Sequence, residues 1–217
     1  MRRSPSIALL VLCLGCLGTP VLAKNNNRFR VDVLLRFEQE PDGFFIGQLR
    51  RQVERIFQPT QIDLWLRKFT PGMSTDARRR TVFFDVKGRC SNTRSQQLST
   101  ELVGMASLGW TFMQSEEAPS YAVIDCDQIS RMVRSVRQQF PANHIHFIFE
   151  RLSGRVLAHE LMHILLGTKI HSERGVTQSP LKSHDIGLAP ALSRAEIAAL
   201  AELGSNSSDG PILSWWP

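Results

Sequence analysis

The chain has 217 residues, of which 42% are hydrophobic and 21% are charged, and its formal net charge is +6. This length allows one well-formed core, or two lobes around a cleft, and excludes two domains of ordinary size. Without Arg2 and Arg3 the charge falls to +4, which is mildly basic and does not indicate a nucleic-acid partner.

The N-terminus has the three parts of an export signal. Arg2 and Arg3 precede an apolar run, Ile7–Leu17, and small residues follow up to Ala23. The run is too short to span a bilayer comfortably, so we interpret Met1–Ala23 as a signal peptide cleaved after Ala23; an uncleaved N-terminal anchor is the alternative. No later apolar run approaches membrane-spanning length, so we expect no stable membrane anchor and a secreted or periplasmic protein.

The cysteines fit an oxidising compartment. Cys13 and Cys16 leave with the signal peptide, and Cys90 and Cys126 remain. Two cysteines in an exported chain allow one intramolecular pairing, so we predict a disulfide between Cys90 and Cys126. The alternative is that both thiols are free or bind a metal ion.

Strands and helices alternate along the rest of the chain. Period-two or β-rich runs predict strands at Phe29–Phe37, Ile62–Leu66, Thr81–Val86 and Tyr121–Asp125. Helical periodicity predicts helices at Phe45–Phe57, Leu98–Met105, Ile129–Phe140, Phe149–Leu166 and Ser193–Leu203. Asp127 is a candidate N-cap for the third of these helices, and Ser193 and Glu196 form a capping box for the last. The basic triplet at 78–80 is interpreted as a solvated turn. This order predicts an α+β lobe followed by a smaller, mostly irregular lobe with a final helix.

The apolar helix predicted at Phe149–Leu166 contains one ionisable cluster, His159-Glu160-Leu161-Met162-His163. His159 and His163 are four residues apart, so on a helix both imidazoles reach one ion, and zinc takes such nitrogens at about 2.0–2.1 Å. Glu160 then points beside the metal ion, toward a bound water, which is the geometry of a general base. The alternative is a structural helix, but unpaired imidazoles in an apolar helix are costly.

A catalytic zinc site needs a third protein ligand, and His171 is the favoured candidate. Gly167 tolerates a positive φ and lets the chain reverse after the helix, which brings His171 back toward the ion. Glu173, His184 and Asp185 remain as alternatives.

The stretch from His159 to His171 resembles the metzincin clan of zinc metalloproteases. It has the form HExxHxxxGxxxH, with one residue more on each side of the glycine than the usual HExxHxxGxxH. The resemblance implies a zincin-like fold over residues 24–204: a mixed twisted sheet with helices, a metal-binding helix at the cleft and a small C-terminal lobe. Residues 205–217 are predicted to be a flexible tail. Metzincins carry a methionine in a turn beneath the zinc, and here Gly175-Val176-Thr177 places Thr177 at that position.

Together these features predict a secreted zinc-dependent endopeptidase. His159, His163 and His171 would bind Zn²⁺, and Glu160 would take the proton of the attacking water. We expect a monomer that acts on a peptide or protein substrate, extended along an edge strand near Thr81–Val86 or Tyr121–Asp125. The alternative is an exported, non-catalytic metal- or peptide-binding module that retains a zincin helix.

Overall fold

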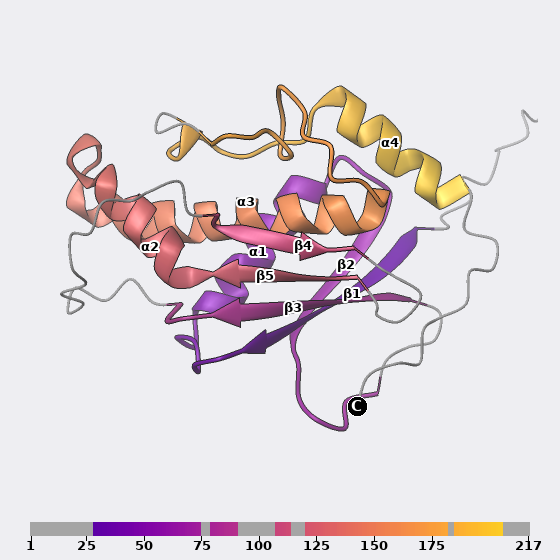
Figure 1. Ribbon diagram of the computed structural model, residues 1–217, viewed down its shortest axis with the longest axis horizontal. Coiled ribbons are helices and arrows are strands. Elements are labelled where there is room, and N and C mark those ends of the chain that lie inside the picture. The colour runs from indigo at the N-terminus through magenta and orange to yellow at the C-terminus, as the bar shows by residue number, and fades with distance from the viewer. Residues whose placement is uncertain (1–27, 75–78, 91–106, 114–119, 182–184, 206–217) are drawn as a thin grey trace, which may run out of the picture.

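A five-stranded mixed sheet forms the centre of the computed structural model, which describes residues 28–74, 79–90, 107–113, 120–181 and 185–205 (Figure 1). The strands are β1 (Phe29–Phe37), β2 (Ile62–Lys68), β3 (Arg80–Lys87), β4 (Gly109–Phe112) and β5 (Tyr121–Asp125). Their order is β2-β1-β3-β5-β4, with β4 antiparallel to β5 and the other neighbours parallel. The α+β class and all four predicted strands are confirmed.

β4 is a strand that the sequence pattern did not predict. Its four residues are too few for an alternating pattern, yet it forms an outer edge of the sheet beside β5. The expectation of an open edge at Thr81–Val86 or Tyr121–Asp125 is wrong, because β3 and β5 both have a strand on each side. The edge close to α3 is β4.

Two helices, α1 (Phe45–Phe57) and α3 (Ile145–Leu166), lie on the same side of the sheet (Figure 1). α1 is amphipathic and buries Phe45, Leu49, Val53, Ile56 and Phe57. α3 begins four residues earlier than predicted, because the 3-10 turn η2 (Ala142–His144) leads directly into it. The helices meet at Gly154, where an added Cβ would lie 2.5 Å from the Cβ of Gln52. Only glycine permits so close an approach.

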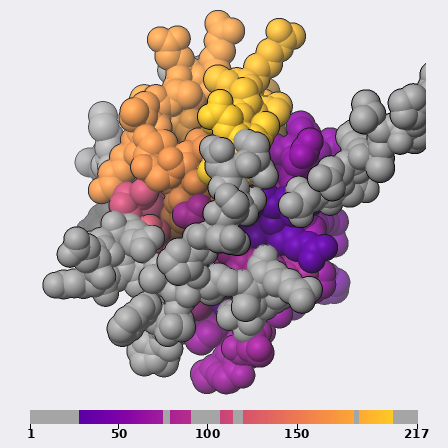
Figure 2. All heavy atoms as spheres, turned by 90° about the vertical axis from the view of Figure 1, so that its right-hand side faces the viewer, coloured from indigo at the N-terminus to yellow at the C-terminus, as the bar shows by residue number. Residues whose placement is uncertain are grey.

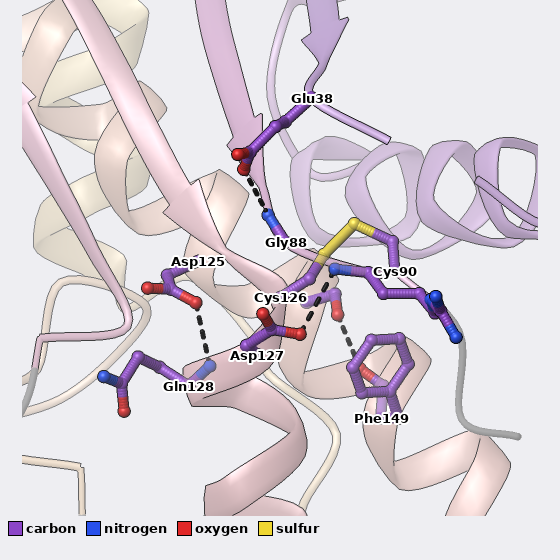
Figure 3. The surroundings of a disulfide bond; sticks show 10 residues. Glu38, Gly88, Cys90, Asp125, Cys126, Asp127, Gln128 and Phe149 are labelled. Carbon is purple, nitrogen blue, oxygen red and sulfur yellow. Dashed lines mark hydrogen bonds between the residues drawn. A yellow bond between two sulfur atoms is a disulfide. The ribbon is translucent and has the colours of Figure 1, made fainter. Parts of the chain in front are cut away.

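The predicted disulfide is present, with the Cα atoms of Cys90 and Cys126 5.1 Å apart. It joins the segment after β3 to the first residue of α2 (Cys126–Ser135), as Figure 3 shows. Beside it, the Gly88 amide donates to the Glu38 carboxylate at 2.9 Å (Figure 3). The bond therefore connects the end of the central sheet to the helix that follows β5.

α2 differs from the prediction at both ends. Asp125, not Asp127, is its N-cap and accepts from the Gln128 amide at 2.9 Å, while Asp127 accepts from the Arg89 amide at 3.2 Å (Figure 3). The helix ends at Ser135, and a separate 3-10 turn, η1 (Arg137–Gln139), follows. The apolar periodicity continues through both elements, so it could not mark the break.

The basic triplet is more than a solvated turn: Arg79 is largely buried, and Arg80, although exposed, is the first residue of β3; Arg78 lies outside the described residues. Arg79 forms an ion pair with the buried Asp32 at 3.3 Å. Arg80 donates to the carbonyls of Ile164 and Leu165 at 3.0 and 3.4 Å. Arg80 thus satisfies carbonyls in the last turn of α3, where helices leave them without partners.

The C-terminal part is irregular until α4 (Arg194–Ser205), as predicted. α4 packs against α3, and Figure 2 shows it, in yellow, beside orange residues that precede it in the chain. The capping box is confirmed: the Glu196 amide donates to Ser193 Oγ at 3.3 Å, and the Ser193 amide donates to Glu196 Oε2 at 2.6 Å.

Some predictions fall on parts of the chain that the structure does not describe. The signal peptide predicted at Met1–Ala23, the helix predicted at Leu98–Met105 and residues 206–217 of the predicted tail lie outside the described residues, and the first residue of that tail, Ser205, instead ends α4. Within those residues, none of the helices combines the length and the hydropathy needed to cross a bilayer.

Candidate metal centre

His159 and His163 lie one turn apart on α3, as the spacing predicts. His159 Nδ1 is 3.0 Å from the Val176 carbonyl, and His163 Nδ1 is 2.7 Å from the Thr168 carbonyl. A carbonyl oxygen only accepts, so both Nδ1 atoms carry the proton. The Nε2 atoms therefore present their lone pairs, which is the tautomer that binds a metal ion.

The turn after α3 brings His171 to the same place. Gly167 ends the helix in the left-handed conformation, with φ of 63°, and the Thr168 amide donates to the His163 carbonyl at 3.2 Å. The His171 ring centroid lies 5.1 Å from that of His159 and 5.0 Å from that of His163. The three side chains offer ligand atoms that all lie within 4.8 Å of one another, so this cluster could hold a metal ion.

The alternative third ligands do not join this cluster. Among the described residues, Glu173 and Asp185 are not part of any such group with His159 and His163. His184 lies outside the described residues. The structure places His171 beside the two helical histidines, and its role as the third ligand stays a prediction.

The donor set fits zinc. The Nε2 atoms of His159 and His163 are 3.0 Å apart, and tetrahedral bonds of about 2.05 Å would place them about 3.3 Å apart. Two bare lone pairs at this separation repel each other, and a shared cation removes the repulsion. Burial lowers the pKa of His159 to about 4, and burial also lowers the pKa of His163, so both stay neutral near pH 7.

Glu160 is buried beside the histidines and is held by the edge strand. Thr111 Oγ1 on β4 donates to Glu160 Oε2 at 2.6 Å. Burial raises the pKa of Glu160 above its usual range, while the hydrogen bond from Thr111 acts in the opposite direction. The sequence pattern did not predict Thr111 as a site residue, because it did not predict β4, the strand that carries Thr111.

A cavity of about 580 Å³ opens at this cluster. Its wall includes the three histidines and Glu160, the edge strand, and the loop after the turn at 175–177; the lining residues from the last two are Gly109, Trp110, Thr111, Gln178, Ser179, Pro180 and Leu181. The candidate ligands and the carboxylate therefore face a space large enough for part of a peptide.

The turn at 175–177 lies against the histidine cluster, at the position where the metzincin resemblance predicts the methionine turn. Gly175 has φ of 96°, and the Val176 carbonyl is the partner of His159 Nδ1. Thr177 is buried and its Oγ1 donates to Glu196 Oε1 at 2.7 Å. Glu196 was recognised from the sequence only as a capping residue, and its contact with the turn had no local signal.

No family model and no curated protein matches the sequence. Among solved structures, the chain is similar to the crystal structure of archaemetzincin from Methanopyrus kandleri, at 10% sequence identity and a TM-score of 0.49. The alignment covers 85% of this chain and 100% of that one. A likeness this distant does not indicate an activity. The evidence for the chemistry of the site is the arrangement of its side chains.

Proposed function

We propose that this chain is a zinc-dependent endopeptidase with His159, His163 and His171 as metal ligands and Glu160 as general base. The observation that carries the proposal is the convergence of three imidazoles beside a buried carboxylate at the wall of an open cavity. A catalytic zinc site uses three protein ligands and leaves one position for water or substrate, and this arrangement fits that requirement.

A zinc ion in this site would act as a Lewis acid on water and on the scissile carbonyl, and would lower the pKa of the water toward about 7. Glu160 would accept the proton of the attacking water and pass it to the leaving amine. Its burial supports this role, because a carboxylate with a raised pKa is a stronger base. Thr111 fixes one carboxylate oxygen at 2.6 Å and leaves the other for the water.

β4 supports a binding mode for an extended peptide. It is an outer strand of the described sheet, and three of its residues, Gly109, Trp110 and Thr111, line the cavity. A substrate added to this edge would form main-chain hydrogen bonds with β4 and bring its scissile carbonyl to the histidine cluster. β4 therefore replaces β3 and β5 as the strand proposed to bind the substrate.

We also propose that the protein is exported, with cleavage after Ala23. The disulfide between Cys90 and Cys126 supports this, because such bonds persist in oxidising compartments. Expression of the full chain in a bacterial host, followed by mass measurement of the periplasmic and extracellular fractions, tests the proposal. A product beginning at Lys24 is expected, and a product that keeps Met1 in the membrane fraction would contradict it.

The test of the enzymatic proposal compares wild type with Glu160→Gln and with Glu173→Gln, which changes an exposed carboxylate outside the cluster. Zinc is measured by elemental analysis, and cleavage is measured on a broad peptide library. We expect about one zinc per chain in all three proteins and a loss of at least about 100-fold in cleavage for Glu160→Gln alone. Zinc with equally negligible cleavage in all three would instead support the non-catalytic binding module, and no zinc would exclude both.

A further inference from the structure

The turn at 175–177 forms an anion-binding concavity, and Glu196 fills it. The amides of Val176 and Thr177 follow Gly175, whose φ is 96°, and both point at the Glu196 carboxylate, at 3.2 and 2.7 Å. Consecutive amides that converge in this way are a common anion site in proteins. The approach requires glycine, because an added Cβ at Gly175 would lie 2.1 Å from Glu196 Oε2.

Glu196 accepts four hydrogen bonds in a buried position. Besides the two turn amides, its donors are Thr177 Oγ1 at 2.7 Å and the Ser193 amide at 2.6 Å. Burial alone would raise the pKa of Glu196, but the hydrogen bonds from Ser193, Thr177 and Val176 lower it below its usual value. Each oxygen accepts two donors, so the site fits a group that only accepts hydrogen bonds.

The other side of the same turn faces the histidine cluster, His159, His163 and His171. The Val176 carbonyl is 3.0 Å from His159 Nδ1, and the Val176 side chain is fully buried. Arg155, one turn before His159 on α3, donates to the Gly175 carbonyl at 3.3 Å. A continuous set of contacts therefore runs from the Glu196 carboxylate, through the peptide group that joins Val176 to Thr177, to the ring of His159.

We propose that Glu196 is a positioning residue for the metal centre. Its carboxylate fixes the turn, the turn fixes the Val176 carbonyl, and that carbonyl holds His159 in the tautomer and orientation that bind the ion. The partner of a ligating histidine contributes strongly to metal affinity. Thr177, at the position where metzincins have methionine, contributes two of the four donors to Glu196, its amide and its hydroxyl. The inference rests on the proposed zinc site but does not depend on peptide cleavage.

Glu196→Gln is the most direct test. Glutamine keeps the side-chain volume, but its NH₂ group replaces one accepting oxygen and then faces N–H or O–H donors of the protein. Ser193→Ala is the matched control, since it removes the side-chain cap of α4 and leaves the turn unchanged. Zinc affinity is measured by competition with a chromophoric chelator. The His159 tautomer is read in the metal-free protein from ¹⁵N shifts of its ring. Folding is checked by circular dichroism.

We expect Glu196→Gln to lower zinc affinity by about 10–100-fold and to reduce the population of the His159 Nδ1–H tautomer. Ser193→Ala should lower thermal stability and leave affinity and tautomer unchanged. Folded Glu196→Gln protein with wild-type affinity and tautomer would overturn the proposal, as would an equal loss of affinity in Ser193→Ala.

If Glu196→Gln does not fold, the variants Thr177→Val and Thr177→Ser test whether the contact between Glu196 and the turn affects zinc affinity. Valine removes one donor to Glu196 and keeps the turn amides, so we expect about a fivefold loss of zinc affinity, whereas serine keeps the hydroxyl and the affinity. Wild-type affinity in Thr177→Val would overturn the role of the carboxylate. A wild-type protein that binds zinc but cleaves no peptide would contradict the endopeptidase proposal and leave this one standing.

Discussion

Gly154 lies where α3 meets α1, and its replacement by alanine tests how closely the helix that carries His159 is held. The added Cβ would lie 2.5 Å from the Gln52 Cβ, whereas ordinary contact begins near 3.4 Å. The Gln52 Cβ is fixed to its helix and cannot rotate away, so we expect the upper part of the range of about 1–3 kcal/mol for overpacking. Alanine regains about 1 kcal/mol as a better helix former than glycine. The net expectation is a loss of about 2 kcal/mol.

The sign of the effect should reverse when the opposing Cβ is removed. In a Gln52→Gly background, Gly154→Ala meets no Cβ at that position and should stabilise the protein by up to about 1 kcal/mol. Equilibrium unfolding in urea of the wild type, the two single variants and the double variant gives the coupling energy, which we expect to be about 3 kcal/mol.

Two results would refute this reasoning. A neutral or stabilising Gly154→Ala in the wild-type background would mean that α1 and α3 do not approach as described. Strict additivity of the two substitutions would mean that the cost of alanine arises somewhere other than at Gln52. The m-values of the four proteins should agree, because a changed m-value would signal a change in the compactness of the native or unfolded state.

Three further predictions concern the site and the disulfide. Thr111→Val removes a donor that lowers the pKa of Glu160, so the carboxyl keeps its proton to higher pH; the acid limb of the kcat/KM profile for peptide cleavage should move up by about one pH unit, and an unmoved limb would contradict the role of the hydroxyl. In metal-free protein the pKa of His159 is about 4, against 6.5 for an unperturbed histidine, so between these values the unfolded state binds more protons; the free energy of unfolding in urea should fall as pH falls through this window, with a smaller slope in His159→Gln, and equal slopes would contradict the burial of the ring. Opening the Cys90–Cys126 disulfide, which spans 36 residues, should cost roughly 4 kcal/mol in the chain-entropy model, and unchanged unfolding of the Cys90→Ala/Cys126→Ala variant would show that the loop is constrained by other contacts.

The sequence predicted the fold well where the periodicity was long. The nine residues of β1 and the thirteen of α1 were located with their correct bounds, because alternation and helical spacing repeat several times there. β4 was missed because four residues, Gly109–Phe112, do not establish a period. The start of α3 was placed late, since a 3-10 turn that leads into a helix leaves no break in composition.

The site residues that local geometry places were predictable from the sequence, and those that only tertiary contacts place were not. His159, Glu160 and His163 were predictable because one helix fixes their relative positions, and His171 was predictable because Gly167 marks a reversal. Thr111 lies 49 residues from Glu160 along the chain, and only the pairing of β4 with β5 brings the two together.

Thr177 illustrates how tertiary contacts change the meaning of a substitution. In the sequence it stands where the metzincin pattern has a methionine, which is a departure from that pattern. In the structure its hydroxyl and amide both donate to Glu196, 19 residues further along the chain. A methionine at 177 could keep only the amide bond and would leave the buried carboxylate with one donor fewer, at a cost of about 1–3 kcal/mol. The threonine and the carboxylate are therefore complementary, and the departure from the metzincin pattern is no argument against an ordered metal site.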